Sequence, residues 1–207
     1  MIKRLLAVSL IFVAMFSFVG CSDVDTPASK TLGIEMQDVA LLTLFSDNGK
    51  GDSNWLVRNY GHTFLSVENI SNNAFAVGDM VVNPGENITI GLWSVFEHFG
   101  VWYNIESNYI KEHNKYDERV SITIGVNLED ITKISGIIKD NDAWTPLYNC
   151  SKFALDVWNT VAVDSEKIQS KFFMSPGYVM DEIKKFEGFD SVKTCETSTT
   201  IRYYGEV

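Results

Sequence analysis

The sequence predicts an α+β fold in which an antiparallel sheet carries helices packed mainly on one side. In the first half of the chain, short runs alternate between apolar and polar residues, which is typical of strands with one buried face. In the second half, apolar residues recur at helical spacing. The chain has 207 residues, of which 45% are hydrophobic and 13% aromatic, enough for one domain with a sizeable core. We therefore expect a single domain over residues 36–207.

The expected strands are separated by clusters of turn residues. Residues 62–69 show the clearest alternation, with His62 and Phe64 on one side and Thr63 and Leu65 on the other. The full set of expected strands covers 36–45, 62–69, 74–78, 87–91, 101–106 and 119–125, followed by closing strands at 190–196 and 199–204.

Three helices are expected in the second half of the chain, each from a start signal or an apolar face. Asn127 caps the first helix, whose apolar positions recur at helical spacing through 128–138. The second helix has a continuous apolar face over 153–161. The third opens on the pair Ser175-Pro176, a capping residue followed by proline at the first helical position, and runs to about residue 186.

Residues 1–20 have the pattern of a secretory signal peptide. Lys3 and Arg4 give it a positive start, and an uncharged apolar run of about fifteen residues follows. This run is short for a membrane span and typical of the apolar region of a signal peptide. The polar stretch after it contains Pro27, so we expect a flexible tether within 21–35.

The end of the apolar run, Phe18-Val19-Gly20-Cys21, resembles a bacterial lipobox, in which a small residue precedes a cysteine that is lipidated. Phe18 departs from the leucine that is usual three positions before the cysteine. Cleavage by ordinary signal peptidase and retention of the apolar segment as an anchor are the alternatives. Lipidation of Cys21 implies a domain tethered by its lipid to the outside of a bacterial membrane, which in a Gram-negative cell is the outer membrane.

Charge and composition exclude several classes of function. The chain has 27 acidic and 17 basic residues and a formal net charge of -10, so phosphate backbones repel it and nucleic acid is not an expected partner. Only 3 Cys and 3 His are present, which excludes a multi-metal or disulfide-dense scaffold. The histidines also lack metal-ligand spacing, and we expect no metal and no cofactor.

Cys150 is the candidate nucleophile. It falls in the first turn of the helix whose apolar face begins at Phe153, where unpaired N–H groups and the positive end of the helix dipole lie. That position stabilises a thiolate and lowers the pKa of the thiol. The same N–H groups can hold a developing oxyanion.

A thiol nucleophile needs a base within hydrogen-bonding reach, and the chain offers three histidines. His62 ranks first, because Gly61 before the strand allows close approach of another backbone or a ligand. His98, which is close in sequence to Trp93, is a site-wall or structural residue. His113 lies in a polar stretch and is expected on the solvated surface.

Two motifs together resemble the circularly permuted papain-like fold. Residues 61–65 read GHTFL, residues 149–154 read NCSKFA about ninety positions later, and 156–159 read DVWN. The fold includes the permuted branch of the NlpC/P60 superfamily and the lecithin retinol acyltransferase-like proteins. In these proteins the histidine strand precedes the cysteine helix. The resemblance covers roughly residues 36–205, and its motifs are short.

The resemblance implies that Cys150 is the nucleophile and His62 the general base. A third polar residue on a neighbouring strand would orient the imidazole. Glu106 is the first choice because a carboxylate on the predicted strand 101–106 can accept the imidazole N–H. Asn104 on the same strand face is second, and Asn73 is third. The stretch 70–100 departs from the family pattern as an insert and leaves the substrate groove undefined.

A disulfide is the competing interpretation of the cysteines. After lipidation of Cys21, Cys150 and Cys195 remain in an oxidising compartment. A bridge between them would close a loop of about 46 residues, contribute roughly 4 kcal/mol and abolish thiol chemistry. We favour a free catalytic thiol, mainly on the resemblance.

These observations lead to a hypothesis of an envelope-anchored cysteine hydrolase that cleaves an amide or ester through an acyl-enzyme. A peptide, cell-wall or lipid acyl group is the expected substrate, and a lipid acyltransferase is one alternative. A non-catalytic envelope binding or structural lipoprotein is the other. In that case aromatic residues would line a carbohydrate or peptide groove, namely Trp93, Trp102, Tyr103 and Tyr109.

Overall fold

A six-stranded antiparallel sheet forms the centre of the molecule, with the strand order β7-β1-β2-β5-β6-β8. The computed structural model describes residues 37–49, 61–95, 97–191, 195 and 200–206. The predicted signal peptide over 1–20, and Cys21 with its tether over 21–35, lie outside the described residues. The strands of the sheet are β1 (Ala40–Asp47), β2 (His62–Asn69), β5 (Asn87–Val95), β6 (His98–Tyr103), β7 (Val120–Val126) and β8 (Arg202–Tyr203). A separate hairpin pairs β3 (Phe75–Val77) with β4 (Met80–Val82).

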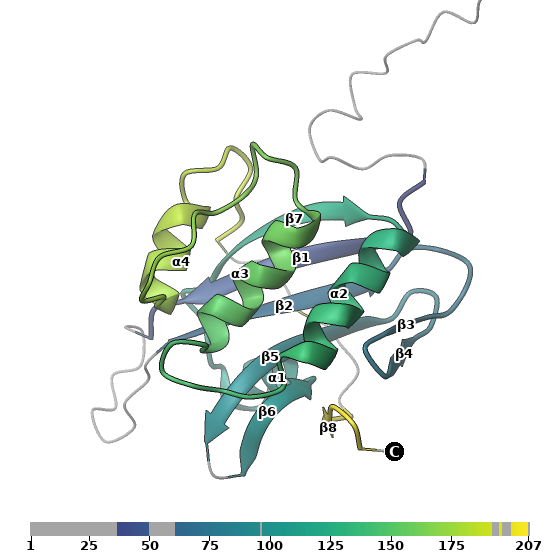
Figure 1. The fold of residues 1–207 in the computed structure, drawn as a ribbon, viewed down its shortest axis with the longest axis horizontal. Helices are drawn as coiled ribbons and strands as arrows, with labels where there is room; N and C mark the ends of the chain where they lie inside the picture. The colour runs from purple at the N-terminus through teal and green to yellow at the C-terminus, as the bar shows by residue number, and fades with distance from the viewer. Residues whose placement is uncertain (1–36, 50–60, 96, 192–194, 196–199, 207) are drawn as a thin grey trace, which may run out of the picture.

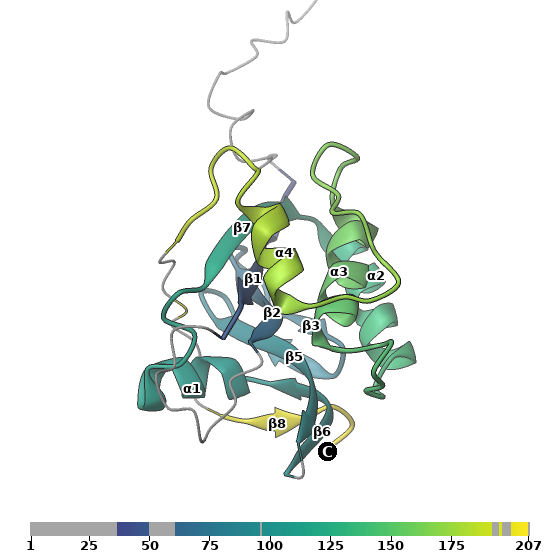
Figure 2. The same ribbon diagram turned by 90° about the vertical axis from the view of Figure 1, so that its left-hand side faces the viewer.

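The helices lie on both faces of the sheet, but unequally. They are α1 (Ile105–His113), α2 (Leu128–Asp140), α3 (Cys150–Val161) and α4 (Pro176–Ile183). Helices α2, α3 and α4 cover one face, here called the helical face, whereas α1 lies on the other side (Figures 1 and 2). The predicted α+β class with helices mainly on one side of an antiparallel sheet is therefore confirmed for the described part of the chain.

The register of β1 with β2 assigns side chains to the two faces. Leu44 pairs with Leu65 and points toward the helical face, whose core also contains the buried Trp158 of α3. Phe45 pairs with Phe64 on the opposite face, because successive residues of a strand alternate in direction. Most buried apolar side chains belong to the helical face, and a smaller aromatic cluster occupies the opposite one.

The three predicted helices are confirmed, and so are the two predicted capping residues, Asn127 and Ser175. The Asn127 side chain accepts the N–H groups of Glu129 and Asp130 as part of a capping box at the start of α2. Ser175 caps α4 and Pro176 is its first residue, although this helix ends at Ile183 rather than near 186. Each cap satisfies backbone donors that the first helical turn leaves unpaired.

Several strand predictions are wrong at their ends: the predicted strand 36–45 is observed at Ala40–Asp47, and the predicted strand 87–91 continues to Val95. The predicted strand 101–106 stops at Tyr103, because Asn104 takes a left-handed conformation with φ of 65° and the chain then enters α1. The predicted closing strand 199–204 is reduced to the two residues of β8. Of 190–196, the described residues show a single bridge between Asp190 and Ser121, and the rest of that prediction falls largely outside them.

Candidate active site

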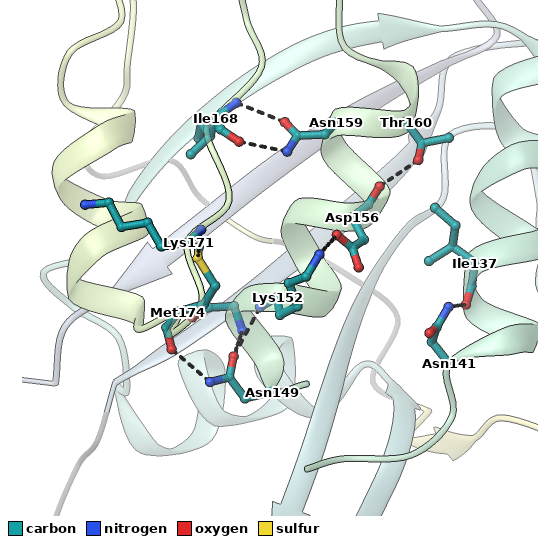
Figure 3. Close-up of polar contacts among 11 residues, drawn as sticks. Ile137, Asn141, Asn149, Lys152, Asp156, Asn159, Thr160, Ile168, Lys171 and Met174 are labelled. Atoms are coloured by element: carbon teal, nitrogen blue, oxygen red, sulfur yellow. Dashed lines mark hydrogen bonds and ion pairs between the residues drawn. The ribbon is translucent and has the colours of Figure 1, made fainter. Parts of the chain in front are cut away.

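Helix α3 begins at Cys150, and Asn149 fixes its first turn. The Asn149 side chain accepts the N–H groups of Ser151 and Lys152, each at 3.1 Å. The backbone carbonyl of Asn149 accepts the N–H of Phe153. Among the described residues, the N–H of Cys150 is then the donor of this turn without a partner. The amide of Asn149 also donates to the carbonyl of Met174 at 2.8 Å, which holds the start of α3 against the segment before α4 (Figure 3).

The residues after Cys150 fasten α3 on both sides. Ser151 shares a hydrogen bond of 2.9 Å with Thr63 of β2, and Thr63 shares one of 3.0 Å with Ser46 of β1. Two turns further along, Asn159 makes paired hydrogen bonds with the backbone of Ile168, as Figure 3 shows. These contacts set the height and rotation of the helix, so the position of the Cys150 sulfur follows from the packing of α3 on the sheet.

His62 is the first residue of β2, and its imidazole lies close enough to the Cys150 thiol for each group to shift the pKa of the other. Its Nε2 lies 3.0 Å from Oε1 of Glu106. Gly61 precedes it with φ of 73°, and a Cβ there would lie 2.3 Å from the carbonyl oxygen of Asp47. The structure thus brings His62, Cys150 and Glu106 together from three separate elements, β2, α3 and α1.

Glu106 is buried completely behind the imidazole and receives three hydrogen bonds. Its Oε1 accepts from Trp93 Nε1 at 2.8 Å as well as from His62, and its Oε2 accepts from the Thr89 hydroxyl at 2.9 Å. Glu106 comes from the first turn of helix α1, not from a strand as predicted. Its orientation is therefore set by the helix start and by two partners on β5.

Gly91 is a residue that the sequence prediction did not single out. A Cβ at this position of β5 would lie 1.8 Å from Glu106 Oε1 and 2.9 Å from His62 Nε2. The contact between carboxylate and imidazole therefore requires a residue without a side chain in the middle of this strand. A glycine inside a strand, as in Ile90-Gly91-Leu92, is a signal of close approach and could have identified it.

The charges of the three groups reinforce one another. Burial alone would lower the pKa of His62, but the negative charges of Cys150 and Glu106 outweigh it and raise that pKa to about 9. Burial would raise the pKa of the Cys150 thiol, yet the positive charge of His62 and the hydrogen bonds to the sulfur lower it overall. Proton transfer from the thiol to the imidazole is thus favoured at neutral pH, giving a thiolate beside an imidazolium.

Aromatic rings surround the imidazole. Trp93 lies 4.4 Å from it between ring centroids and Tyr116 lies 5.8 Å away, while Phe64 is stacked at 5.9 Å. Tyr116 has φ of 58°, a backbone conformation that is strained for a bulky residue. These faces attract a positively charged ring and restrict access of water to it.

A pocket of about 520 Å³ opens beside the Cys150 sulfur. Its walls come from β5, from the residues before β7, from the start of α4 and from the segment between α2 and α3. The lining residues are Gly61, His62, Leu92, Trp93, Ser94, Val95, Tyr116, Trp144, Asn149, Cys150 and Pro176. This size suits a small-molecule group or one side chain of a larger substrate.

Asp142 holds the wall that carries Trp144. Its Oδ1 accepts the N–H of Val101 on β6 at 2.5 Å, and its Oδ2 accepts the hydroxyl of Tyr203 on β8 at 2.6 Å. Gly100 makes room for this carboxylate, since a Cβ there would lie 2.4 Å from Oδ1. The segment between α2 and α3 is thereby attached to the edge of the sheet.

The other predicted candidates lie outside this group. Asn104 accepts the N–H of Thr89 and donates to the carbonyl of Thr200, so it supports the start of α1 and does not contact His62. Asn73 is exposed in the turn before β3, and its backbone accepts hydrogen bonds from Asn69 and Ser71.

The two remaining histidines also lie apart from the Cys150 sulfur. His98 opens β6 and lies against Trp102, with ring centroids 4.6 Å apart. His113 ends α1 and is exposed, as predicted.

The two described cysteines are not bonded to each other. No disulfide joins Cys150 and Cys195, so the alternative of a bridge between them is not realised in this structure. Cys195 is buried with Phe45, Phe64 and Tyr116 on the face opposite the helical face. Cys150 is half-buried and lines the pocket.

The described part of the chain lacks a metal-ligand cluster and a membrane-spanning helix, and comparisons with known proteins found no match. No three His, Cys, Asp or Glu side chains in it are grouped as metal ligands. None of its helices has the length and apolar character needed to cross a bilayer. The chain has no significant match to a protein-family model, to a curated protein or to a solved structure.

Proposed function

We propose that this protein is a cysteine hydrolase that cleaves an amide or ester bond through an acyl-enzyme. One observation carries the proposal: His62 lines the same pocket as the Cys150 thiol and is hydrogen-bonded to the buried carboxylate of Glu106. A nucleophile, a base and a group that orients the base are the parts that covalent acyl transfer requires. The histidine strand preceding the cysteine helix supports a permuted papain-like fold as part of this proposal.

The proposed reaction uses Cys150, His62 and Glu106 in turn. The Cys150 thiolate attacks the carbonyl carbon, and the N–H of Cys150 at the start of α3 donates to the oxyanion that forms. The tetrahedral intermediate collapses as the His62 imidazolium gives its proton to the leaving amine or alcohol, which leaves a thioester on Cys150. Water then attacks the thioester while His62 accepts its proton, and the acid is released. Glu106 keeps the imidazole oriented and stabilises its positive charge throughout.

The cellular setting belongs to the same proposal. Lipidation at Cys21 would tether the domain to the outside of a bacterial membrane, where a peptide, cell-wall or lipid acyl group is in reach. Transfer of the acyl group to an acceptor other than water would make the protein an acyltransferase. Mass spectrometry of the mature protein tests the anchor, because lipidation adds a diacyl or triacyl mass to a chain that begins at Cys21.

The pH dependence of Cys150 alkylation tests the catalytic pair. Iodoacetamide reacts with thiolates, so Cys150 should react at pH 6–7 much faster than free cysteine. Cys195 serves as the comparison within the same chain, because it is buried, does not line the pocket and should react only on unfolding. An alkylation midpoint of Cys150 equal to that of free cysteine would show that the thiol is not activated and would remove the proposal.

A non-catalytic binding protein on the same fold is the second candidate. The aromatic walls of the pocket, Trp93, Tyr116 and Trp144, favour it because flat apolar surfaces suit peptides and sugars. Burst kinetics with an activated ester separate the two candidates. An acyl-enzyme releases one equivalent of leaving group rapidly and carries the acyl mass on Cys150, whereas a binding protein does neither.

A further inference from the structure

We infer that the pocket beside Cys150 receives a neutral, apolar acyl group, and that the enzyme rejects acyl donors with a charge close to the scissile carbonyl. This inference rests on the proposed function, because it names the substrate class of the same site. Three properties of the described part of the pocket support it. Few of its lining residues are ionisable, several nearby charged side chains have partners, and its walls are largely apolar.

The lining provides no partner for a charged group. Apart from His62 and Cys150, which pair with each other, none of the described lining residues is ionisable at neutral pH. The pKa of Tyr116 lies well above its ordinary value because of burial and the nearby charges of Glu106 and Cys150, so its phenol stays neutral. Ser94 and Asn149 add neutral polar groups.

Three charged side chains close to the described lining have partners of their own, namely Glu106, Asp142 and Lys152. Glu106 accepts three hydrogen bonds behind the imidazole, and Asp142 accepts two behind the wall that carries Trp144. On α3, Lys152 forms an ion pair with Asp156 one turn further along the helix (Figure 3). None of these groups, within the described residues, is left to bind a substrate carboxylate or ammonium.

The walls favour an apolar occupant. Leu92 and Trp93 of β5, Tyr116, Trp144 and Pro176 contribute aliphatic and aromatic surface from separate elements. A volume of about 520 Å³ accommodates an acyl chain of several carbons together with part of the leaving group. Burial of each methylene against such walls favours binding by a factor of about three to four.

A charged acyl group meets a different balance. On entering the pocket it loses its water, and none of the described lining residues outside the His62–Cys150 pair supplies an opposite charge in its place. The penalty is paid in the ground state and in the transition state alike, so kcat/KM falls for both signs of charge. The pocket therefore discriminates against charged acyl groups, because their lost hydration is not compensated by its described lining.

Three p-nitrophenyl esters of equal acyl length test the inference on the full chain. The acyl groups are butyrate, succinate (a carboxylate at the far end) and 4-(trimethylammonio)butyrate. We expect kcat/KM to be highest for butyrate and about 100-fold lower for each charged ester, and to rise about threefold per methylene from acetate to hexanoate. The cationic ester controls for the net charge of -10 of the chain, which repels anions in general.

A charge placed on the pocket wall should reverse this preference. Val95 is 49% exposed at the end of β5 and lines the pocket, so a lysine there can be tolerated by the fold. Val95→Lys should raise kcat/KM for succinate relative to butyrate by tenfold or more, whereas the matched variant Val95→Gln should not. In both variants Cys150 should still be alkylated faster than free cysteine at pH 6–7, which shows that the nucleophile is intact.

Binding to Cys150→Ser gives a readout that needs no catalysis. Hexanamide and adipamic acid have the same number of carbons and differ by a terminal carboxylate. Tryptophan fluorescence should report at least tenfold tighter binding of hexanamide. Equal binding of the two amides, or equal hydrolysis of a charged ester by an enzyme whose Cys150 alkylates normally, overturns the inference. A Cys150 that alkylates like free cysteine and forms no acyl-enzyme instead refutes the proposed function.

Discussion

The two faces of the sheet are built on different principles. The helical face buries a continuous set of aliphatic and aromatic side chains, among them Leu65 and Trp158, under α2, α3 and α4. The opposite face has a small aromatic cluster around Phe64 and, beside it, the buried polar residues His62 and Glu106. Apolar burial is the main favourable term in folding, whereas buried charges are costly unless they are paired. The helical face therefore stabilises the domain, and the opposite face sustains a reactive group.

The meeting of the two faces produces the candidate site. Cys150 starts a helix of the helical face, whereas His62 and Glu106 belong to the other face. The three residues meet where β2 begins. Stability and reactivity should therefore respond separately to substitutions on the two faces.

Glu106→Gln should have the largest effect, and it should act on reactivity. The substitution keeps the shape but removes the charge that favours the imidazolium, so the pKa of His62 should fall and that of Cys150 should rise. We expect kcat/KM to fall about 10²- to 10⁴-fold and the alkylation midpoint to move to higher pH. Thermal unfolding measures the stability of the variant. A large loss of stability with an unchanged alkylation midpoint would contradict the separation of reactivity from stability.

Leu65→Ala should have the opposite signature. Leu65 is fully buried on the helical face, and its truncation should lower the free energy of unfolding by about 2–5 kcal/mol. The alkylation midpoint of Cys150 should not move, because His62 and Glu106 lie on the other face. Urea unfolding and alkylation on the same sample make the measurement, and a shifted midpoint would show that the faces are coupled.

Gly91→Ala should disturb the opposite face through space alone. The added methyl group would overlap Glu106 Oε1, so the carboxylate must move away from His62. We expect a stability loss of about 1–3 kcal/mol and an alkylation midpoint shifted in the same direction as in Glu106→Gln. Gly136 of α2, around which a Cβ has open space, provides the control, and Gly136→Ala should leave the midpoint unchanged.

The pH profile of hydrolysis should have an upper limit set by His62. Below a pKa of about 9 the imidazole carries the proton that the leaving group needs, and above it that proton is lost. We expect kcat/KM to fall about tenfold per unit above pH 9. Toward acid, activity should persist to below the ordinary pKa of a thiol, because His62 lowers that of Cys150. A profile that still rises through pH 9 would contradict a protonated His62.

Much of the fold was predictable because local signals agreed with tertiary packing. Asn127 and Ser175 precede apolar residues at helical spacing and each caps the helix that it predicts, whereas the cap made by Asn149 was not predicted. The alternation of 62–69 likewise assigns its residues to the two faces of β2. In these segments the capping residue or the apolar period alone was sufficient.

Helix α1 was not predictable in this way. The apolar alternation through Tyr103 and Ile105 continues the strand pattern, and the N-cap residue Asn104 makes no side-chain hydrogen bond to the first turn. Its side chain instead bonds to Thr89 and Thr200, which are distant in sequence. The helix start thus depends on tertiary contacts that no local pattern contains.

The candidate site was predictable as residue types but not as geometry. His62 and Cys150 were found from a glycine before a strand and a cysteine at a helix start. Glu106 was chosen correctly as a neighbour of His62 but for the wrong element, because its contact depends on the turn at Asn104. Gly91 could be interpreted only once the two side chains it accommodates were in place.

The left-handed backbone of Tyr116 has a practical consequence for anyone who seeks a more heat-resistant version of this chain. A bulky residue in that conformation costs about 1–3 kcal/mol, and glycine or asparagine would relieve it. The same exchange would strip the imidazole of one of its aromatic walls. Because the ring is also buried against Phe64, its removal costs about 3–5 kcal/mol, more than the strain that it relieves. A screen that rewards only survival on heating should therefore retain the tyrosine, and with it the aromatic wall beside His62.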